Sequence, residues 1–136
     1  MSLYESDIVA WAEQNAEALR ERRFDDVDWD NVADEILDVA KREASALGSQ
    51  LFHILVYLLK AKYHPGKHKR SWDLSLAEHR IRAGQTVDES PSLKSRLAEL
   101  MEDAYELARL RAAKQTGIEL SVFPEQCPFN QDEVLG

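Results

Sequence analysis

The sequence predicts an all-α fold: a four-helix core with one long central helix over about residues 29–62, and an irregular C-terminal tail that ends in a short helical turn. Apolar residues recur at intervals of three and four in four separate stretches, which is the period of an amphipathic helix. No segment shows the apolar and polar alternation of a strand, and no internal repeat is present. Because 136 residues is the length of one domain, we expect a single helical domain over residues 1–136.

Composition indicates where the protein is located and which classes of partner its surface does not suit. The one cysteine, Cys127, cannot form an internal disulfide, and Met1–Gln14 lacks the basic-then-apolar pattern of a signal peptide, so we expect a cytoplasmic protein. The net charge of −8 argues against a surface that binds nucleic acid or an anionic membrane as a whole, because those partners require a positive footprint.

The charge is unevenly distributed along the chain. Residues 51–87 carry 7 Lys and Arg against 2 Asp and Glu, whereas residues 1–50 carry 5 against 13 and residues 88–136 carry 5 against 10. A basic centre between acidic ends suits an anionic ligand. Acidic helices that pack around a basic one explain the same distribution equally well.

The first helix is predicted from its capping residues. Ser6 is a plausible N-cap with Asp7 in the first turn, and the helix then runs to the basic Arg20–Arg23 end, where cations favour a helix C-terminus. A short acidic connection follows. Asp28 is the expected N-cap of the central helix.

The central helix must pass Gly48-Ser49, a pair that can end one helix and cap the next. Phase argues for continuity, because one set of apolar residues stays on one side only if the helix runs straight through: Ile36, Ala40, Leu47, Leu51, Leu55 and Leu58. We therefore predict one helix from Trp29 to about Lys62, on the order of 50 Å long.

The core of the protein is predicted at Leu51–Leu59. Only His53 and Tyr57 interrupt this apolar run, so a helix here must be covered on nearly all sides, and we expect Leu55 and Leu58 to be fully buried. The run is far shorter than the roughly 20 residues that cross a bilayer, so no membrane partner is expected.

The third helix is bounded by turn and cap signals. His64-Pro65-Gly66 ends the central helix, and Ser71 is the expected N-cap of a helix that fades from Gly84 onward. Its inward face is expected to carry Trp72, Leu74, Leu76, Ala77 and Ile81.

The fourth helix has the clearest boundaries. Ser90 as N-cap with Pro91 at the first helical position predicts its start, and Gly117 its end. Its predicted core-facing stripe comprises Leu93, Leu97, Leu100, Met101, Ala104, Leu107, Ala108 and Ala112.

The C-terminal segment is predicted to wrap around the helices. Ile118–Phe129 contains two prolines and too little periodicity for a regular element. Asn130, with Glu133 three residues later, forms a capping box that predicts one helical turn over residues 131–135.

Several phrases, in their order and spacing, resemble the bacterial family called domain of unknown function 29. The resemblance implies a small helical, cytoplasmic bacterial domain with no established activity. Tyr57 and Ala61 stand where that family's pattern is expected to have histidine and tryptophan, so no role of an imidazole or indole carries over to those positions. The phrases that carry the resemblance are Tyr4-Glu5-Ser6-Asp7, Trp11-Ala12-Glu13, Ala33-Asp34-Glu35-Ile36, Leu58-Leu59-Lys60, Ser71-Trp72, Ser90-Pro91-Ser92-Leu93 and Phe123-Pro124-Glu125-Gln126-Cys127-Pro128.

A polar stripe on the central helix is the candidate ligand site. Helical spacing places His53, Tyr57, Lys60 and His64 on one face, which emerges from the core beside the basic segment. Tyr63 and Trp72 complete the candidate ligand-binding set. The alternative is that these polar groups only satisfy one another's hydrogen bonds at the edge of the core.

The patterns that usually mark catalysis or metal binding are missing. No glutamate precedes a histidine by three residues, as in di-metal helical bundles, and Pro65-Gly66 separates His64 from His68. Gly48-Ser49 and Cys127 lack a recognisable base, and no phosphate-binding glycine loop is present. We predict no catalytic residue, no metal site and no cofactor.

Two function classes remain. We predict a non-enzymatic helical interaction or assembly module, because an overlong central helix and a tail accompany no catalytic set. The alternative is a binder of nucleic acid or another anionic ligand through residues 60–82, where aromatic side chains accompany a candidate anion-binding set: Lys62, Lys67, Lys69, Arg70 and Arg80.

Self-association is the expected partnership. A helix of this length outruns its partners within the chain, which leaves apolar surface for a two-fold dimer, near Trp29 and Val32 or along Phe52, Val56 and Tyr63. The tail around Phe123–Phe129 is the alternative cover for that surface.

Overall fold

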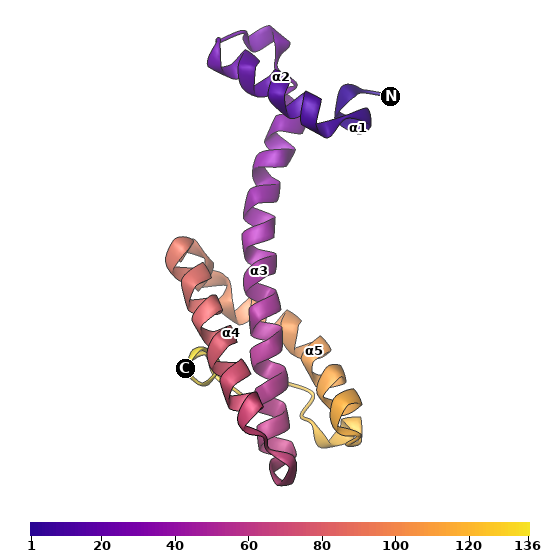
Figure 1. Cartoon of the computed structure of the whole chain (residues 1–136), viewed down its shortest axis with the longest axis vertical. Helices are drawn as coiled ribbons and strands as arrows, with labels where there is room; N and C mark the ends of the chain where they lie inside the picture. Colours follow the sequence, from indigo (N-terminus) through magenta and orange to yellow (C-terminus); the bar gives the residue numbers. More distant parts are fainter. The chain divides into compact units, whose positions relative to one another are not determined.

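The computed structural model describes all residues from 1 to 136 and contains helices but no strand (Figure 1). This confirms the all-α prediction. Four short 3-10 helices, at residues 24–26, 65–67, 91–96 and 120–122, connect the longer elements. The α-helices are α1 (Leu3–Ser6), α2 (Ile8–Arg20), α3 (Trp29–Tyr63), α4 (Arg70–Glu89), α5 (Leu97–Thr116) and α6 (Gln131–Leu135).

Helix α3 is one continuous helix of 35 residues, as the phase of its apolar residues predicted. Gly48 and Ser49 lie inside it, and neither has the positive φ that would mark a helix end. The C-terminus of α3 falls at Tyr63, directly before His64 and Pro65. A proline cannot continue the backbone hydrogen-bond pattern of a helix.

The chain forms two compact units, residues 1–42 and 43–136, with the boundary inside α3. We describe each unit by itself. The single domain expected over residues 1–136 stays a prediction, because a division into compact units does not test whether they unfold together.

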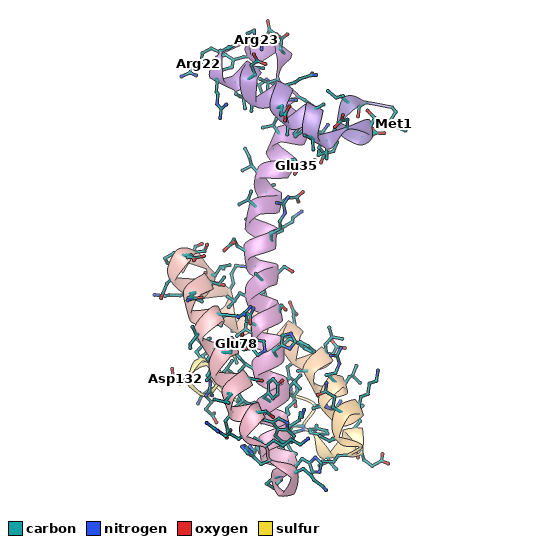
Figure 2. All side chains as sticks on the ribbon, viewed as in Figure 1. Met1, Arg22, Arg23, Glu35, Glu78 and Asp132 are labelled. Atoms are coloured by element: carbon teal, nitrogen blue, oxygen red, sulfur yellow. The ribbon has the colours of Figure 1, made fainter.

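Trp11 organises the N-terminal unit. Its ring is buried and meets the ring of Tyr4 edge to face, with centroids 4.8 Å apart. Its indole N–H donates to the Asp28 carboxylate at 2.8 Å, and the Tyr4 hydroxyl donates to Glu35. The hydrogen bond to Glu35 raises the pKa of Tyr4 to about 12. Figure 2 shows Glu35 on α3, and Arg22 and Arg23 at the turn after α2.

The capping residues of this unit differ in part from the prediction. Ser6 ends α1, and Asp7 caps α2 by accepting the Ala10 N–H at 3.1 Å. The Asp28 carboxylate accepts from the Asn31 amide as well as from Trp11, and these hydrogen bonds lower its pKa. Local sequence marks a capping residue, but it does not settle which of two adjacent polar residues begins the helix.

The C-terminal half of α3 is the core of the second unit. Helices α4 and α5 accompany it (Figure 1), and both contribute to one buried apolar cluster with it. Leu55 is fully buried as predicted, whereas Leu58 is only partly buried and lies at the edge of the cluster. The fully buried residues of α3 are Leu47, Leu51, Ile54, Leu55 and Leu59.

By length and composition, α3 contains an 18-residue window apolar enough to cross a membrane, and 39% of that window is buried inside the protein. The core helix of a water-soluble protein meets the same criteria. The five fully buried residues of α3 give this helix such a core position in the C-terminal unit.

Helix α4 is longer than predicted, and it buries a different face from the one predicted. It begins at Arg70, so Ser71 lies inside it, and it continues through Gly84 to Glu89. Its buried residues are Ala83 and Val87, one turn apart. Ile81 lies two residues before Ala83, about 200° around the helix, and is 62% exposed for that reason. Leu74, on the same outer side, is 59% exposed.

Helix α5 begins later than predicted. Pro91 is the first residue of the 3-10 helix Pro91–Arg96, and α5 proper starts at Leu97. The prediction that Leu107 faces the core is wrong: it is 64% exposed, because the buried line passes through the neighbouring Ala108. The helix ends as predicted at Gly117, in the left-handed conformation with φ 74°.

The tail is held by hydrogen bonds from side chains to its backbone carbonyls. Arg109 Nε donates to the Phe123 carbonyl at 3.0 Å, and Arg80 Nε donates to the Val134 carbonyl at 3.1 Å. Phe123 and Val134 are buried in the core cluster. The predicted capping box of Asn130 and Glu133 is present at the start of α6.

Leu55→Ala removes a fully buried side chain from the core, and we expect it to lower the free energy of unfolding by about 2–5 kcal/mol. Urea unfolding followed by circular dichroism measures this loss. Leu74→Ala is the matched control on an exposed face and should cost much less. Equal midpoints for the two variants would place the core elsewhere.

Candidate functional site

The predicted polar stripe lies at the seam between α3 and α4. His53 stacks on His79 of α4 with ring centroids 4.5 Å apart, and the Tyr57 ring lies nearly parallel to that of His79 with centroids 6.2 Å apart. A ring nitrogen of His79, Nδ1, lies 2.8 Å from the Gln50 side-chain oxygen. Sequence reasoning missed His79, although it falls seven residues after Trp72 and so shares its helix face.

Lys60 of α3 contacts side chains of both α4 and α5. Its ammonium nitrogen lies 4.6 Å from the centroid of the Trp72 ring in α4 and 5.3 Å from that of Tyr57. It also donates to the side-chain oxygen of Gln115 in α5 at 3.1 Å. Burial, and then the nearby Lys69, lower the pKa of Lys60. The ammonium group of Lys60 is therefore already engaged by other side chains of the same chain.

The remaining stripe residues lie apart from this seam. Tyr63 packs edge to face on Phe123 of the tail, with centroids 5.5 Å apart. His64 follows the end of α3, and its buried Nδ1 has no hydrogen-bond partner. The C-terminal unit has two cavities, of about 670 and 630 Å³. Neither Tyr63 nor His64 lines them, and neither do the stacked rings of His53, Tyr57 and His79.

The candidate anion-binding residues are also divided. Lys67, Lys69 and Arg70 are exposed around the turn between α3 and α4. Lys62 lies over the rings of Tyr63 and Phe129, at 5.7 and 5.5 Å from their centroids. Arg80 is occupied by the tail carbonyls of Val134 and Glu133.

The larger cavity is an open groove between α3 and α5, with a volume of about 670 Å³. We call it the α3–α5 groove. Both helices contribute small residues as well as large apolar ones, and three charged residues of α5 take part in the lining. The groove is lined by Ala44, Ser45, Gly48, Ser49, Phe52, Leu100, Asp103, Ala104, Leu107, Leu110, Arg111 and Lys114.

The groove has an empty floor and apolar walls. A Cβ atom added at Gly48 would meet no other atom within 4 Å. Leu107 is 64% exposed and Leu110 is 50% exposed, although both are large apolar residues in a helix interior. The guanidinium carbon of Arg111 lies 5.4 Å from the centroid of the Phe52 ring, and the residue as a whole is exposed. No ion pair within the chain involves Arg111.

Sequence reasoning did not find this groove. Helical spacing predicts Leu107 in the core, and the Gly48-Ser49 pair indicates no more than a possible helix break. The available signal was Gly48, a residue without a side chain inside a helix whose phase continues past it. Gly84 in α4 shares this feature and lies outside the groove, so the signal alone does not locate the groove.

The second cavity, of about 630 Å³, lies beside the tail and includes the one cysteine. Burial raises the pKa of the Cys127 thiol, which donates to the Phe129 carbonyl at 3.5 Å. Burial also raises the pKa of Tyr105 to about 12. A raised thiol pKa is the opposite of what a cysteine nucleophile needs.

Fold and groove together define a small all-α protein with an apolar interhelical groove at its C-terminal unit. The chain belongs to the family described as Domain of unknown function DUF29, which matches residues 3–136. This match confirms the resemblance found in the sequence. No curated protein and no solved structure matches the sequence.

The stacked histidines generate a pH prediction. Burial first, then neighbouring positive charge, lowers the pKa of His53 below its ordinary 6.5, and burial also lowers that of His79. The unfolded chain therefore binds more protons than the folded chain just below pH 6.5. We expect full stability above that pH and a loss as the pH falls through the lowered folded pKa values.

Thermal unfolding at a series of pH values from neutral to mildly acidic measures this loss. A variant carrying both His53→Gln and His79→Gln should unfold with a shallower pH dependence than the unmodified chain. The same slope in both proteins would contradict the assignment to the stacked pair.

Proposed function

We propose that this protein is a non-enzymatic helical interaction module whose α3–α5 groove binds an amphipathic helix of a protein partner. The observation that supports it most is the pair of exposed leucines, Leu107 and Leu110, beside a floor with no side chain at Gly48. Apolar grooves between two helices recognise partner helices that present apolar anchors one turn apart.

The position of Gly48 supports close approach by a partner backbone. A glycine in a helix interior destabilises the helix by roughly 1 kcal/mol relative to alanine. Here it serves neither a turn nor a positive φ, and a Cβ added at this position would meet no atom of another part of the chain within 4 Å. Helices pack 8–10 Å apart depending on the side chains at the contact, so a glycine allows the closest approach.

The chemistry of the lining also favours binding over catalysis. Its α3 side presents small and aromatic residues, and its charged groups are all on α5: Asp103, Arg111 and Lys114. One carboxylate against two cations makes the charged part of the lining net positive. An acidic amphipathic helix is therefore the best electrostatic match.

A second candidate function rests on the exposed cations Lys67, Lys69 and Arg70, which project around the turn before α4. They are fewer than the sequence suggested, because Arg80 donates to the tail carbonyls and Lys62 lies over the Tyr63 and Phe129 rings. An anionic ligand here has a small footprint on a chain of net charge −8. This alternative ranks below the groove.

The groove proposal is tested with two synthetic helix-forming peptides that carry leucine at positions i, i+3, i+4 and i+7, one acidic and one basic on the remaining positions. The protein is diluted until sedimentation gives the mass of one chain. We expect the acidic peptide to bind more tightly and to shift the amide NMR signals of Gly48 and Leu107. Failure of both peptides to shift these signals would overturn the proposal.

Two glycine variants provide the matched comparison. Gly48→Leu fills the groove floor, whereas Gly84→Leu adds the same side chain on α4 in space that is equally open at the Cβ position. We expect the first to abolish peptide binding and the second to preserve it. Equal peptide affinity in the two variants would place the binding surface elsewhere.

The nucleic-acid alternative makes its own prediction. Binding through the exposed cations must weaken steeply with added salt as counterions are released, and reversing the charges of Lys67, Lys69 and Arg70 must remove it. Titration of labelled single- and double-stranded DNA and RNA at low salt measures this. An absence of binding at low salt rejects the alternative, and the groove variants should not alter the result.

A further inference from the structure

We infer that the α3–α5 groove binds the same groove of a second copy of this chain, with a two-fold axis that passes beside Leu107 of α5. This inference rests on the proposed function and names its partner: helix α5 of a second copy, an amphipathic helix with four acidic residues against three basic ones. It also replaces part of the dimer surface expected from the sequence, because Val56 is buried in the core and Tyr63 is covered by Phe123. Phe52, from the same expected surface, lines the groove.

The groove residues of α5 are spaced symmetrically about Leu107. Ala104 and Leu110 lie three residues to either side, Asp103 and Arg111 four residues to either side, and Leu100 and Lys114 seven. Offsets of three, four and seven keep all of them on one helix face. When two such helices cross antiparallel at Leu107, each position meets its mirror position in the other copy.

Charge complementarity follows from this spacing. The mirror position of Asp103 is Arg111, so a two-fold pairing places a carboxylate opposite a guanidinium twice. Neither side chain forms an ion pair within its own chain, and both are exposed. Lys114 meets Leu100, over which its aliphatic stem can lie while the ammonium group stays in water. No like charges face each other among these positions.

Shape complementarity is also built into one chain. On the two-fold axis Leu107 meets its own counterpart, and Leu110, which is 50% exposed, meets the small Ala104 of the other copy. The open space above Gly48 lies beside this contact on each copy. A surface that places a large apolar group opposite a small one in this way can pair with itself in an isologous dimer. The net charge of −8 opposes association, but exposed charges are screened over about 8 Å at physiological ionic strength, whereas apolar burial is not.

Sedimentation equilibrium over a range of concentrations tests the inference on the full chain. We expect association toward twice 15.5 kDa. Asp103→Arg and Arg111→Asp should each weaken the dimer about tenfold or more, a change of about 1.4 kcal/mol, because each places like charges opposite one another. The double variant carrying both changes should recover most of the affinity. A merely structural role of either residue predicts additive losses instead.

Two further variants separate the groove from the rest of the surface. Leu107→Glu should give a single 15.5 kDa species, whereas Leu74→Glu, on the exposed face of α4, should dimerise like the unmodified chain. Circular dichroism verifies that each variant is folded.

Three results would overturn the second-copy inference: an unmodified chain that stays at 15.5 kDa on concentrating, a double variant that is no better than its singles, or equal effects of the Leu107 and Leu74 variants. The groove proposal fails separately, through the peptides. If the chain stays monomeric but binds the peptides, the groove proposal stands and the partner is a different protein. If the chain dimerises and Gly48→Leu does not change the dimer affinity, the dimer interface lies outside the groove.

Discussion

The structure of the C-terminal unit depends on covering one apolar helix segment that has almost no polar face. Five residues of α3, from Leu47 to Leu59, are fully buried, so helices are needed on more than one side of it. Helices α4 and α5 supply most of the cover, and the tail adds Phe123 and Val134. The side chains that hold this cover in place are Arg80, Arg109 and Lys60, each of which hydrogen-bonds across elements.

The same constraint accounts for the polar groups that look most like a site in the sequence. His53 and Tyr57 interrupt the apolar run where α4 crosses α3, and their rings stack on His79. Lys60 emerges from the run between the Tyr57 and Trp72 rings. His79 and Lys60 also hydrogen-bond across helices, to Gln50 of α3 and Gln115 of α5. Each of these polar residues therefore contacts a neighbouring helix at the edge of the core.

The α3–α5 groove is the place where this cover is incomplete. Large apolar residues on α5 stay exposed beside Gly48, so apolar surface and open space coexist on the one unit that has a well-packed core. Leu107 and Leu110 expose apolar surface in that position, and a partner helix would bury it. For this reason the groove, and not the polar seam, carries both functional proposals.

Local sequence was sufficient to predict the elements whose signals lie within a few residues of one another. The continuity of α3, the end of α5 at Gly117 and the Asn130–Glu133 capping box all follow from helical phase and backbone preference. Tertiary structure alone decided which face of each outer helix is buried: of the predicted neighbours Leu107 and Ala108 only Ala108 is buried, and on α4 Ala83 is buried instead of Ile81. A rotation of one residue changes a helix face by about 100°, and packing against α3, not hydrophobicity along the chain, selects among such rotations. The groove and the contact of His79 with α3 both arise from that selection.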